Sequence, residues 1–516
     1  MGKLLKEKTF CYIFNFIGTL LFFVLFYHCL SMTGENLGPS WDEHIIFKRD
    51  SVLANVFWIL VSLVFLYYIG KISGKLTMKI RNVMLGSACV LSAVISFYWV
   101  LGSKAGPVGD QSLICQYANA FNRGDFQGLL TGRYIARCPQ QIGMVTLLRG
   151  IFLMFGESNY QMFQYMVAAL VPVLVLSGCK IVRLLSDCNA KAELYYLLFA
   201  VCCFPMYAYT VFVYGDLISI IAGMFSAWMY LGCLKCFSWW RLAAFGLSIG
   251  AAICLRNNFL ILLIALAIVT FVKLCFERKW KYFAMLAALV LGWGGMQTAV
   301  WGIYHDVRTE DAPAIPALLY IVMGLNDDYQ YPGWYNQYNY VTFAHSNDNV
   351  ELAKAKAWED LHMYLEIYKN DPDYMVDFFT RKMNAQWNAP MFQSIAMNSD
   401  VEGEQLPLVK NIYEHGKLGK FIEAGMKLFQ MLMYGGILFL LVMRRREYVE
   451  IEKYLLLIAV FGGFLFSLMW EAKTRYVLPY LFMQIPYMAM GVGEIVSWME
   501  KAVMAELSHK FSIFNR

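Results

Sequence analysis

The sequence predicts an all-α polytopic membrane protein with about twelve transmembrane helices. Hydrophobic residues make up 59% of the 516 residues and charged residues only 16%, whereas soluble domains carry about 25% charged residues. The mean hydropathy is +0.49. Apolar stretches recur along the chain, and Lys and Arg form short clusters between them. This pattern indicates membrane topology rather than nucleic-acid binding, so we expect no nucleic-acid partner.

Two apolar stretches form the N-terminal part, residues 1–82. The first, 10–30, follows Lys3, Lys6 and Lys8, and at roughly 20 residues it is long enough to span a bilayer and too long for a signal-peptide core. Because positive charges stay in the cytoplasm, we expect a cytoplasmic N-terminus. The second, 52–69, returns the chain to that side.

The predicted core, residues 83–303, begins with a span at 83–101 that leads to an external loop at 102–160. Further spans are expected at 162–181, 194–213, 217–234, 242–255, 259–274 and 283–301. Residues 304–420 form a long polar segment, which the alternation of sides makes external. Residues 421–516 hold three more spans and a tail that is predicted to be cytoplasmic.

Ionisable residues remain in the short turns on the predicted outer side. Such residues are costly at membrane depth and indicate a functional site by default, although a solvated helix cap would explain any single one. Because they all fall on one side, we expect them to converge on one cavity. They are Asp110, Asp216, Arg256, Glu471, Lys473 and Arg475.

Carboxylates and cations at one membrane face are typical of a site for a lipid-linked phosphate. Arg and Lys side chains would bind the phosphate, and a carboxylate just outside a membrane span, such as that of Asp110, suits a general base that takes the proton of an acceptor hydroxyl. The sequence has no P-loop and no Gly-rich turn for a nucleotide. A polyprenyl-phosphate sugar is therefore a better donor than a nucleotide sugar.

The motifs around Asp110 resemble the first luminal loop of the GT-C superfamily of membrane glycosyltransferases. The likeness is to the bacterial family 39 type, which is related to protein O-mannosyltransferases and aminoarabinose lipid A transferases. Later motifs are similar to further landmarks of that branch. The motifs are 109–111, 117–120, 124–126, Tyr134, 139–143, 155–156, 323–325, 333–335, 381–382, 387–390 and 471–476, followed by Pro479.

This resemblance implies a GT-C-like helical bundle with amphipathic helices in the external loop. It also implies an inverting transfer in which Asp110 is the base, with Arg256 and Arg475 as ligands of the donor phosphate. The acceptor would be a glycan, a lipid or a protein of the cell envelope, with membrane lipids around the bundle. The expected substrate contacts are Gln111, Tyr134, Gln140, Gln141, Asp216, Glu471 and Tyr476.

Other interpretations remain open. Asp42 or Glu43 would be the base if the family's first span were residues 10–30, but no equivalent of the run 134–143 follows Asp42. A transporter or a lipid-linked-glycan flippase would also have about twelve spans. Such proteins usually show internal repeats and mid-span broken helices, which this sequence does not display. A receptor with a degenerate glycosyltransferase fold is a third interpretation.

Metal and thiol chemistry have little support. His305, His345 and His415 lack the spacing of a zinc site, although external carboxylates leave room for a divalent cation. The CxxC at 233–236 lies at the end of a span, where a small apolar role is commoner than redox chemistry. The two cysteines in a predicted external segment are Cys115 and Cys138, and the sequence leaves their pairing open.

The external segment 304–420 is large enough for structure of its own. An aromatic and Asn-rich tract, 329–340, precedes a stretch with helical character at 349–368. Aromatic faces beside amides suit a carbohydrate, and they equally suit a belt of side chains at the membrane interface.

Overall fold

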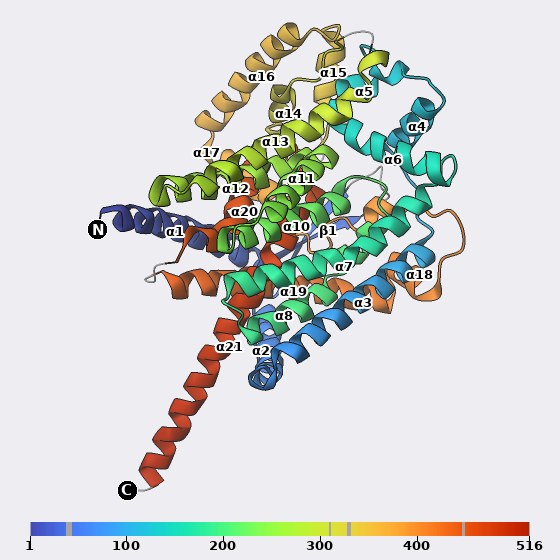
Figure 1. The fold of residues 1–516 in the computed structure, drawn as a ribbon. Helices are drawn as coiled ribbons and strands as arrows, with labels where there is room; N and C mark the ends of the chain where they lie inside the picture. Colours follow the sequence, from blue (N-terminus) through green and yellow to red (C-terminus); the bar gives the residue numbers. More distant parts are fainter. Residues whose placement is uncertain (1, 38–43, 309–310, 328–331, 446–448, 515–516) are drawn as a thin grey trace.

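The computed structural model describes residues 2–514 apart from 38–43, 309–310, 328–331 and 446–448. Its described residues form helices α1–α21 with short 3-10 helices between them, and a single two-stranded sheet. Figure 1 shows the long helices side by side in a bundle, with α4–α6 and α14–α16 gathered beyond one of its flanks. The predicted all-α polytopic membrane architecture is confirmed.

Nine helices of the described chain are long and apolar enough to cross a membrane, or up to eleven spans if two bent helix pairs are included. All nine coincide with predicted spans. They are Cys11–Ser31, Val52–Lys75, Met78–Ser103, Tyr160–Leu185, Asp216–Lys235, Asn257–Glu277, Trp280–Gly302, Lys417–Arg444 and Ile451–Met469. The side of the membrane on which each terminus lies stays a prediction.

The three remaining predicted stretches are helical but less regular. The stretch 194–213 is bent by 51° between α8 (Ala190–Cys202) and α9 (Phe204–Ala208), where Pro205 in the first turn of α9 has no N–H to continue α8. Helix α11 (Trp239–Leu255) has 17 residues. Helix α21 (Leu478–Phe514) contains Pro486. The total of about twelve spans therefore stays a prediction.

Glycines let several bundle helices pack backbone to backbone. A Cβ on Gly250 of α11 would meet the carbonyl oxygen of Gly292 in α13 (Trp280–Gly302). A Cβ on Gly491 of α21 would likewise meet the carbonyl of Gly436 in α19 (Lys417–Arg444). Small residues at such crossings are common where helices pack in a membrane, because they allow close van der Waals contact.

The loop that the sequence predicts to be external, 102–160, contains the helices α4 (Asp110–Asn122), α5 (Tyr134–Arg137) and α6 (Ile142–Phe155). It follows α3 (Met78–Ser103), which ends at Lys104 in the left-handed conformation. The segments on either side of Cys138 are bent by 103°, and Pro139 begins the second of them. This loop therefore turns back on itself before the chain enters α7 (Tyr160–Leu185).

The segment 304–420, which the sequence predicts to be external, contains α14 (Ala317–Gly324), α15 (Tyr338–His345), α16 (Val350–Asn370), α17 (Pro372–Trp387) and α18 (Pro407–Tyr413). The predicted helix at 349–368 is confirmed as α16, and the Asn349 side chain caps it by accepting from the N–H groups of Glu351 and Leu352. Helix α17 enters the bundle, where the Trp387 ring stacks on Tyr480 at 5.7 Å between centroids.

A β-hairpin, β1 (Met32–Leu37) and β2 (His44–Arg49), follows α1 (Gly2–Ser31) and was not anticipated from the sequence. The Gly34 N–H donates to the Asn388 carbonyl at 2.7 Å. Ile45 packs in one apolar cluster with Trp334 and Ala472. Asp42 and Glu43, the alternative bases, lie outside the described residues.

Candidate functional site

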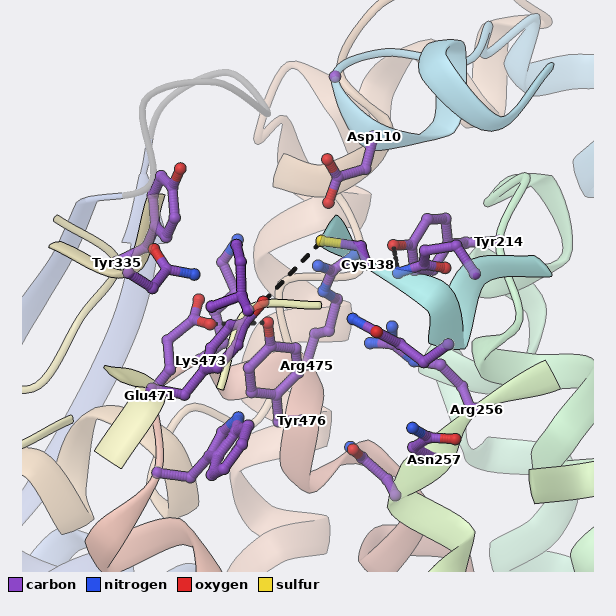
Figure 2. A pocket seen from close by; sticks show the side chains of 18 of the residues that line it. Asp110, Cys138, Tyr214, Arg256, Asn257, Tyr335, Glu471, Lys473, Arg475 and Tyr476 are labelled. Atoms are coloured by element: carbon purple, nitrogen blue, oxygen red, sulfur yellow. Dashed lines mark hydrogen bonds between the residues drawn. The ribbon is translucent and has the colours of Figure 1, made fainter. Parts of the chain in front are cut away.

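A cavity of about 950 Å³ lies where the first loop, the external segment and the ends of α11 and α20 (Leu455–Met469) meet. Its walls come from segments far apart in the sequence (Figure 2). All the predicted site residues except Asp216 line it. They are Asp110, Gln111, Tyr134, Gln140, Gln141, Arg256, Glu471, Lys473, Arg475 and Tyr476.

Asp110 is the first residue of α4 and is exposed to the cavity. The preceding Gly109 has φ +54°, a conformation that a residue with a Cβ rarely adopts, and this turn sets the start of the helix. Among the described residues, the Asp110 carboxylate has no ion pair and accepts no hydrogen bond. Figure 2 shows it pointing into the cavity from the side opposite Tyr476 and Asn257.

Arg256 and Arg475 form the basic part of the cavity. Arg256 follows the last residue of α11, and Arg475 lies in the 3-10 turn Thr474–Val477 that follows α20. The guanidinium carbon of Arg256 lies 4.9 Å from the ring centroid of Tyr214 and 5.6 Å from that of Tyr476. The corresponding distances for Arg475 are 5.4 and 5.5 Å. Cation–π contact therefore holds both guanidinium groups against the same two rings.

Asp216 has a different position from the one expected. Its side chain is buried at 3% exposure, does not line the cavity, and lies 3.2 Å from an Arg256 nitrogen. A direct substrate contact by Asp216 is therefore not supported. It lies behind Arg256, where its charge favours the ionised guanidinium and the ion pair orients it.

Two glutamines connect the first loop to the turn that carries Tyr214. The Gln111 Oε1 atom accepts from the Val213 N–H at 2.8 Å, and the Gln141 side-chain amide donates to the Tyr214 hydroxyl. Burial, followed by the Asp110 carboxylate, raises the pKa of Tyr214, so this hydroxyl stays neutral. Gln111 is thus engaged with the backbone, although it lines the cavity.

Tyr134, on the same loop, stacks on Tyr117 with ring centroids 5.9 Å apart. Burial raises its pKa well above the usual value, and the neighbouring Tyr214 adds to the shift. Its neutral hydroxyl is a hydrogen-bond donor and acceptor at the cavity wall.

The segment after α20 supplies Glu471, Lys473 and Tyr476. The Tyr476 hydroxyl donates to the Glu471 carboxylate at 3.3 Å. The Lys473 ammonium lies 6.0 Å from the ring centroid of Tyr335, which projects from the external segment. This wall therefore combines both charges with an aromatic face, as a site for a polar ligand requires.

One wall of the cavity is apolar and belongs to candidate spans. Leu260, Ile261 and Ile264 of α12 (Leu260–Glu277) line it, together with Phe466 and Trp470 at the end of α20. Ile264 is 53% exposed and Phe466 36% exposed. The cavity therefore continues from the arginines to the exposed flank of two membrane helices.

Sequence reasoning missed several lining residues. Tyr214, Cys138, Tyr335 and Asn257 line the cavity and were not expected as site residues. Tyr214 could have been found, because it precedes Gly215 and Asp216 in one predicted turn.

Cys138 and Cys115 are both free, so they form no disulfide. Throughout the described ranges, no group of three or more His, Cys, Asp or Glu side chains could hold a metal ion.

Comparisons with protein-family models and with curated proteins find no match for this sequence. The resemblance to the GT-C glycosyltransferases therefore rests on the motifs alone, and the site must be interpreted from its own geometry.

Proposed function

We propose that the protein is an integral-membrane glycosyltransferase that moves a sugar from a polyprenyl-phosphate donor to an acceptor hydroxyl at the outer face of the membrane. The observation that carries this proposal is that the cavity has a basic part and an apolar part. Arg256 and Arg475 lie at its polar part, while Ile264 and Phe466 continue it onto the exposed flank of α12 and α20. A polyprenyl phosphate has the same division into an anionic head and an apolar chain.

The basic part of the cavity suits a phosphate. Two guanidinium groups lie close to the same rings, and the Asp216 carboxylate pairs with Arg256. Among the described residues, the Nε of Arg256 has no hydrogen-bond partner. This nitrogen is itself shielded from solvent, so an anion in the cavity would interact with the guanidinium group as a whole and would offset the repulsion between two like charges.

Asp110 supplies the general base. In the proposed reaction, the acceptor oxygen forms a bond to the anomeric carbon of the donor sugar as the bond from that carbon to the phosphate oxygen breaks. The acceptor's proton passes to the Asp110 carboxylate, and the electron pair of the broken bond leaves with the polyprenyl phosphate. The guanidinium groups stabilise the charge that develops on this leaving group.

Transfer by purified protein tests the proposal. The protein is reconstituted in lipid nanodiscs with short-chain polyprenyl-phosphate sugars and an acceptor mixture from cell envelopes, and release of polyprenyl phosphate and glycosylated products is followed by mass spectrometry. We expect product formation that depends on both substrates. Absence of transfer, together with movement of a lipid-linked glycan across the membrane of sealed liposomes, would replace the proposal with a transporter or flippase.

A further inference from the structure

Lys382 of α17 is fully buried, with an exposed fraction of 0%. Its ammonium donates to the carbonyl oxygens of Leu468 at 2.9 Å and Trp470 at 2.8 Å, and also to that of Gly324. Gly324 ends α14, and the other two carbonyls lie at the end of α20. An ammonium has three N–H donors, so the three carbonyls use all of them.

This arrangement matches what helix C-termini require. The last carbonyls of a helix lack intrahelical partners and carry the negative end of the helix dipole. Lys382 satisfies such carbonyls in two helices at once. Burial lowers the pKa of Lys382 to about 7, and the Glu471 carboxylate opposes this shift. A buried charge is costly unless it is both paired and hydrogen-bonded; the three carbonyls supply the hydrogen bonds, and the Glu471 carboxylate favours the charged form.

Glycines allow the three backbone segments to meet at this ammonium. A Cβ on Gly324 would lie 2.5 Å from the carbonyl of Trp470. Gly333 has φ +73°, and a Cβ there would lie 2.9 Å from the Lys382 nitrogen and closer still to the Gly324 carbonyl. Any side chain at either position would therefore separate the ammonium from its acceptors.

The same backbone leads directly into the cavity. The Ala472 N–H donates to the Gly333 carbonyl at 2.6 Å, and Trp334 and Ala472 form a parallel bridge. Farther along, the Thr474 hydroxyl donates to the carbonyl of Ala385, one turn after Lys382 in α17, at 2.8 Å. Helix α17 thus contacts the chain at two places: Lys382 binds the backbone just before residues 471–476, and the carbonyl of Ala385 binds Thr474 within them.

We propose that Lys382 is a positioning residue of this site, which ties the ends of α14 and α20 together so that Glu471, Lys473 and Arg475 face the cavity. The part of this inference that concerns sugar transfer rests on the proposed function. We define the clamp as Lys382 with the carbonyls of Gly324, Leu468 and Trp470. The clamp itself does not rest on the proposed function.

The test compares Lys382→Met, which keeps the apolar stem and removes the donors, with Lys382→Arg, which keeps the charge. Lys354→Met in α16 is the control, because the Lys354 side chain is 43% exposed and contacts no part of the cavity. Hydrogen exchange of the full-length protein in nanodiscs is measured without substrate. In Lys382→Met we expect exchange over residues 471–476 to rise by about tenfold, with α7 unchanged, and Lys382→Arg to restore part of the protection. The control should match the wild type.

Unchanged exchange over 471–476 in Lys382→Met would overturn the clamp. A uniform rise through the whole bundle would also overturn it, because that result describes a general packing role. Should Lys382→Met fail to fold, Gly333→Ala decides the matter, since it displaces the ammonium without removing its charge. The same local rise is expected there, and wild-type exchange would end the proposal.

Kinetics then separate this inference from the proposed function. With transfer established for the wild type, Lys382→Met should bind donor about tenfold more weakly and turn over more slowly, while Lys354→Met keeps both values. Local exchange changes without any transfer by the wild type would leave the clamp supported and the glycosyltransferase proposal refuted. Wild-type kinetics in Lys382→Met would refute the positioning role alone.

Discussion

Arg256 and Arg475 lie against the same tyrosine, with guanidinium carbons 4.9 and 5.4 Å from the ring centroid of Tyr214. The two arginines come from turns that follow different bundle helices, α11 and α20. Like charges repel at this range, and Asp216 pairs with Arg256. An anion bound between or beside them would reduce this repulsion.

Replacing Arg256 or Arg475 with Ala should weaken the binding of polyprenyl phosphate by about 1.5 to 3 kcal/mol, the range for hydrogen bonds to charged groups. Lys at either position should restore binding only in part, because it lacks the planar fork of Arg. Arg123→Ala is the control, since Arg123 is exposed on the surface. Binding is measured by titration in nanodiscs, and unchanged affinity in both Ala variants would remove the arginines from the site.

Asp110→Asn should lower turnover by about 100-fold to 10,000-fold, because the amide cannot accept the proton of the acceptor hydroxyl. Donor affinity and expression should persist. Asp125→Asn in the same loop is the matched control, because Asp125 is exposed and its side-chain oxygen accepts from the Gln127 N–H, as an Asn would.

The same assay tests the alternative bases. Asp42→Asn and Glu43→Gln should reduce turnover much less than Asp110→Asn at matched membrane levels. Near wild-type turnover in Asp110→Asn, combined with loss in either of the other two, would move the base to the segment between β1 and β2.

The apolar wall should discriminate between donors by chain length. Ile264→Asn places an amide where an apolar chain would pack, so affinity for a long-chain polyprenyl phosphate should fall by about fivefold, or ~1 kcal/mol. Affinity for a donor too short to reach α12 should not change. Leu291→Asn on α13 controls for a polar residue on an exposed membrane helix, since Leu291 is 71% exposed. Equal losses for both chain lengths would contradict this binding mode.

Lys382 predicts a pH dependence of stability with a definite sign. Burial lowers the pKa of Lys382 to about 7, whereas an unfolded Lys has a pKa of about 10.4. Between these values the unfolded chain binds more protons than the folded one. The free energy of unfolding of the wild type, relative to Lys382→Met, should therefore rise with pH across this window by at most about 1.4 kcal/mol per unit. Thermal unfolding in detergent at several pH values measures this difference.

Activity should change in the opposite direction. A neutral amine has two N–H donors for three carbonyl acceptors, so the clamp weakens as pH rises above 7. Turnover of the wild type should therefore fall as the pH rises above 7, and this decrease should be absent from the pH profile of Lys382→Met. An equal decrease of turnover in both proteins would show that another group titrates in this range.

The sequence predicted the membrane helices and most of the cavity because both depend on local signals. Apolar length identifies a span, and Asp110, Arg256 and Glu471 are unusual simply because they lie at span ends. Placing span ends on one side of the bundle brings them together without knowledge of side-chain packing. Asp216 shows the limit of this argument, since a charged residue in the right turn can face the protein interior instead of the cavity.

The hairpin and the clamp could not be predicted from the same signals. Strands β1 and β2 depend on contacts with Asn388, Trp334 and Ala472, which lie far along the chain. Lys382 stands in a polar helix, where a Lys ordinarily faces solvent. Its burial follows from the carbonyls of α14 and α20, and no periodicity in α17 indicates them.

The hairpin also constrains the order in which the parts of the protein can fold. Gly34 leaves the ribosome early, but its acceptor is the carbonyl of Asn388, and Ile45 packs with Ala472. During synthesis β1 and β2 therefore lack these contacts, and their apolar face stays exposed, until the C-terminal spans have been inserted. Truncated chains that end before residue 388 would keep this face exposed, so they should be the preferred targets of membrane quality-control proteases.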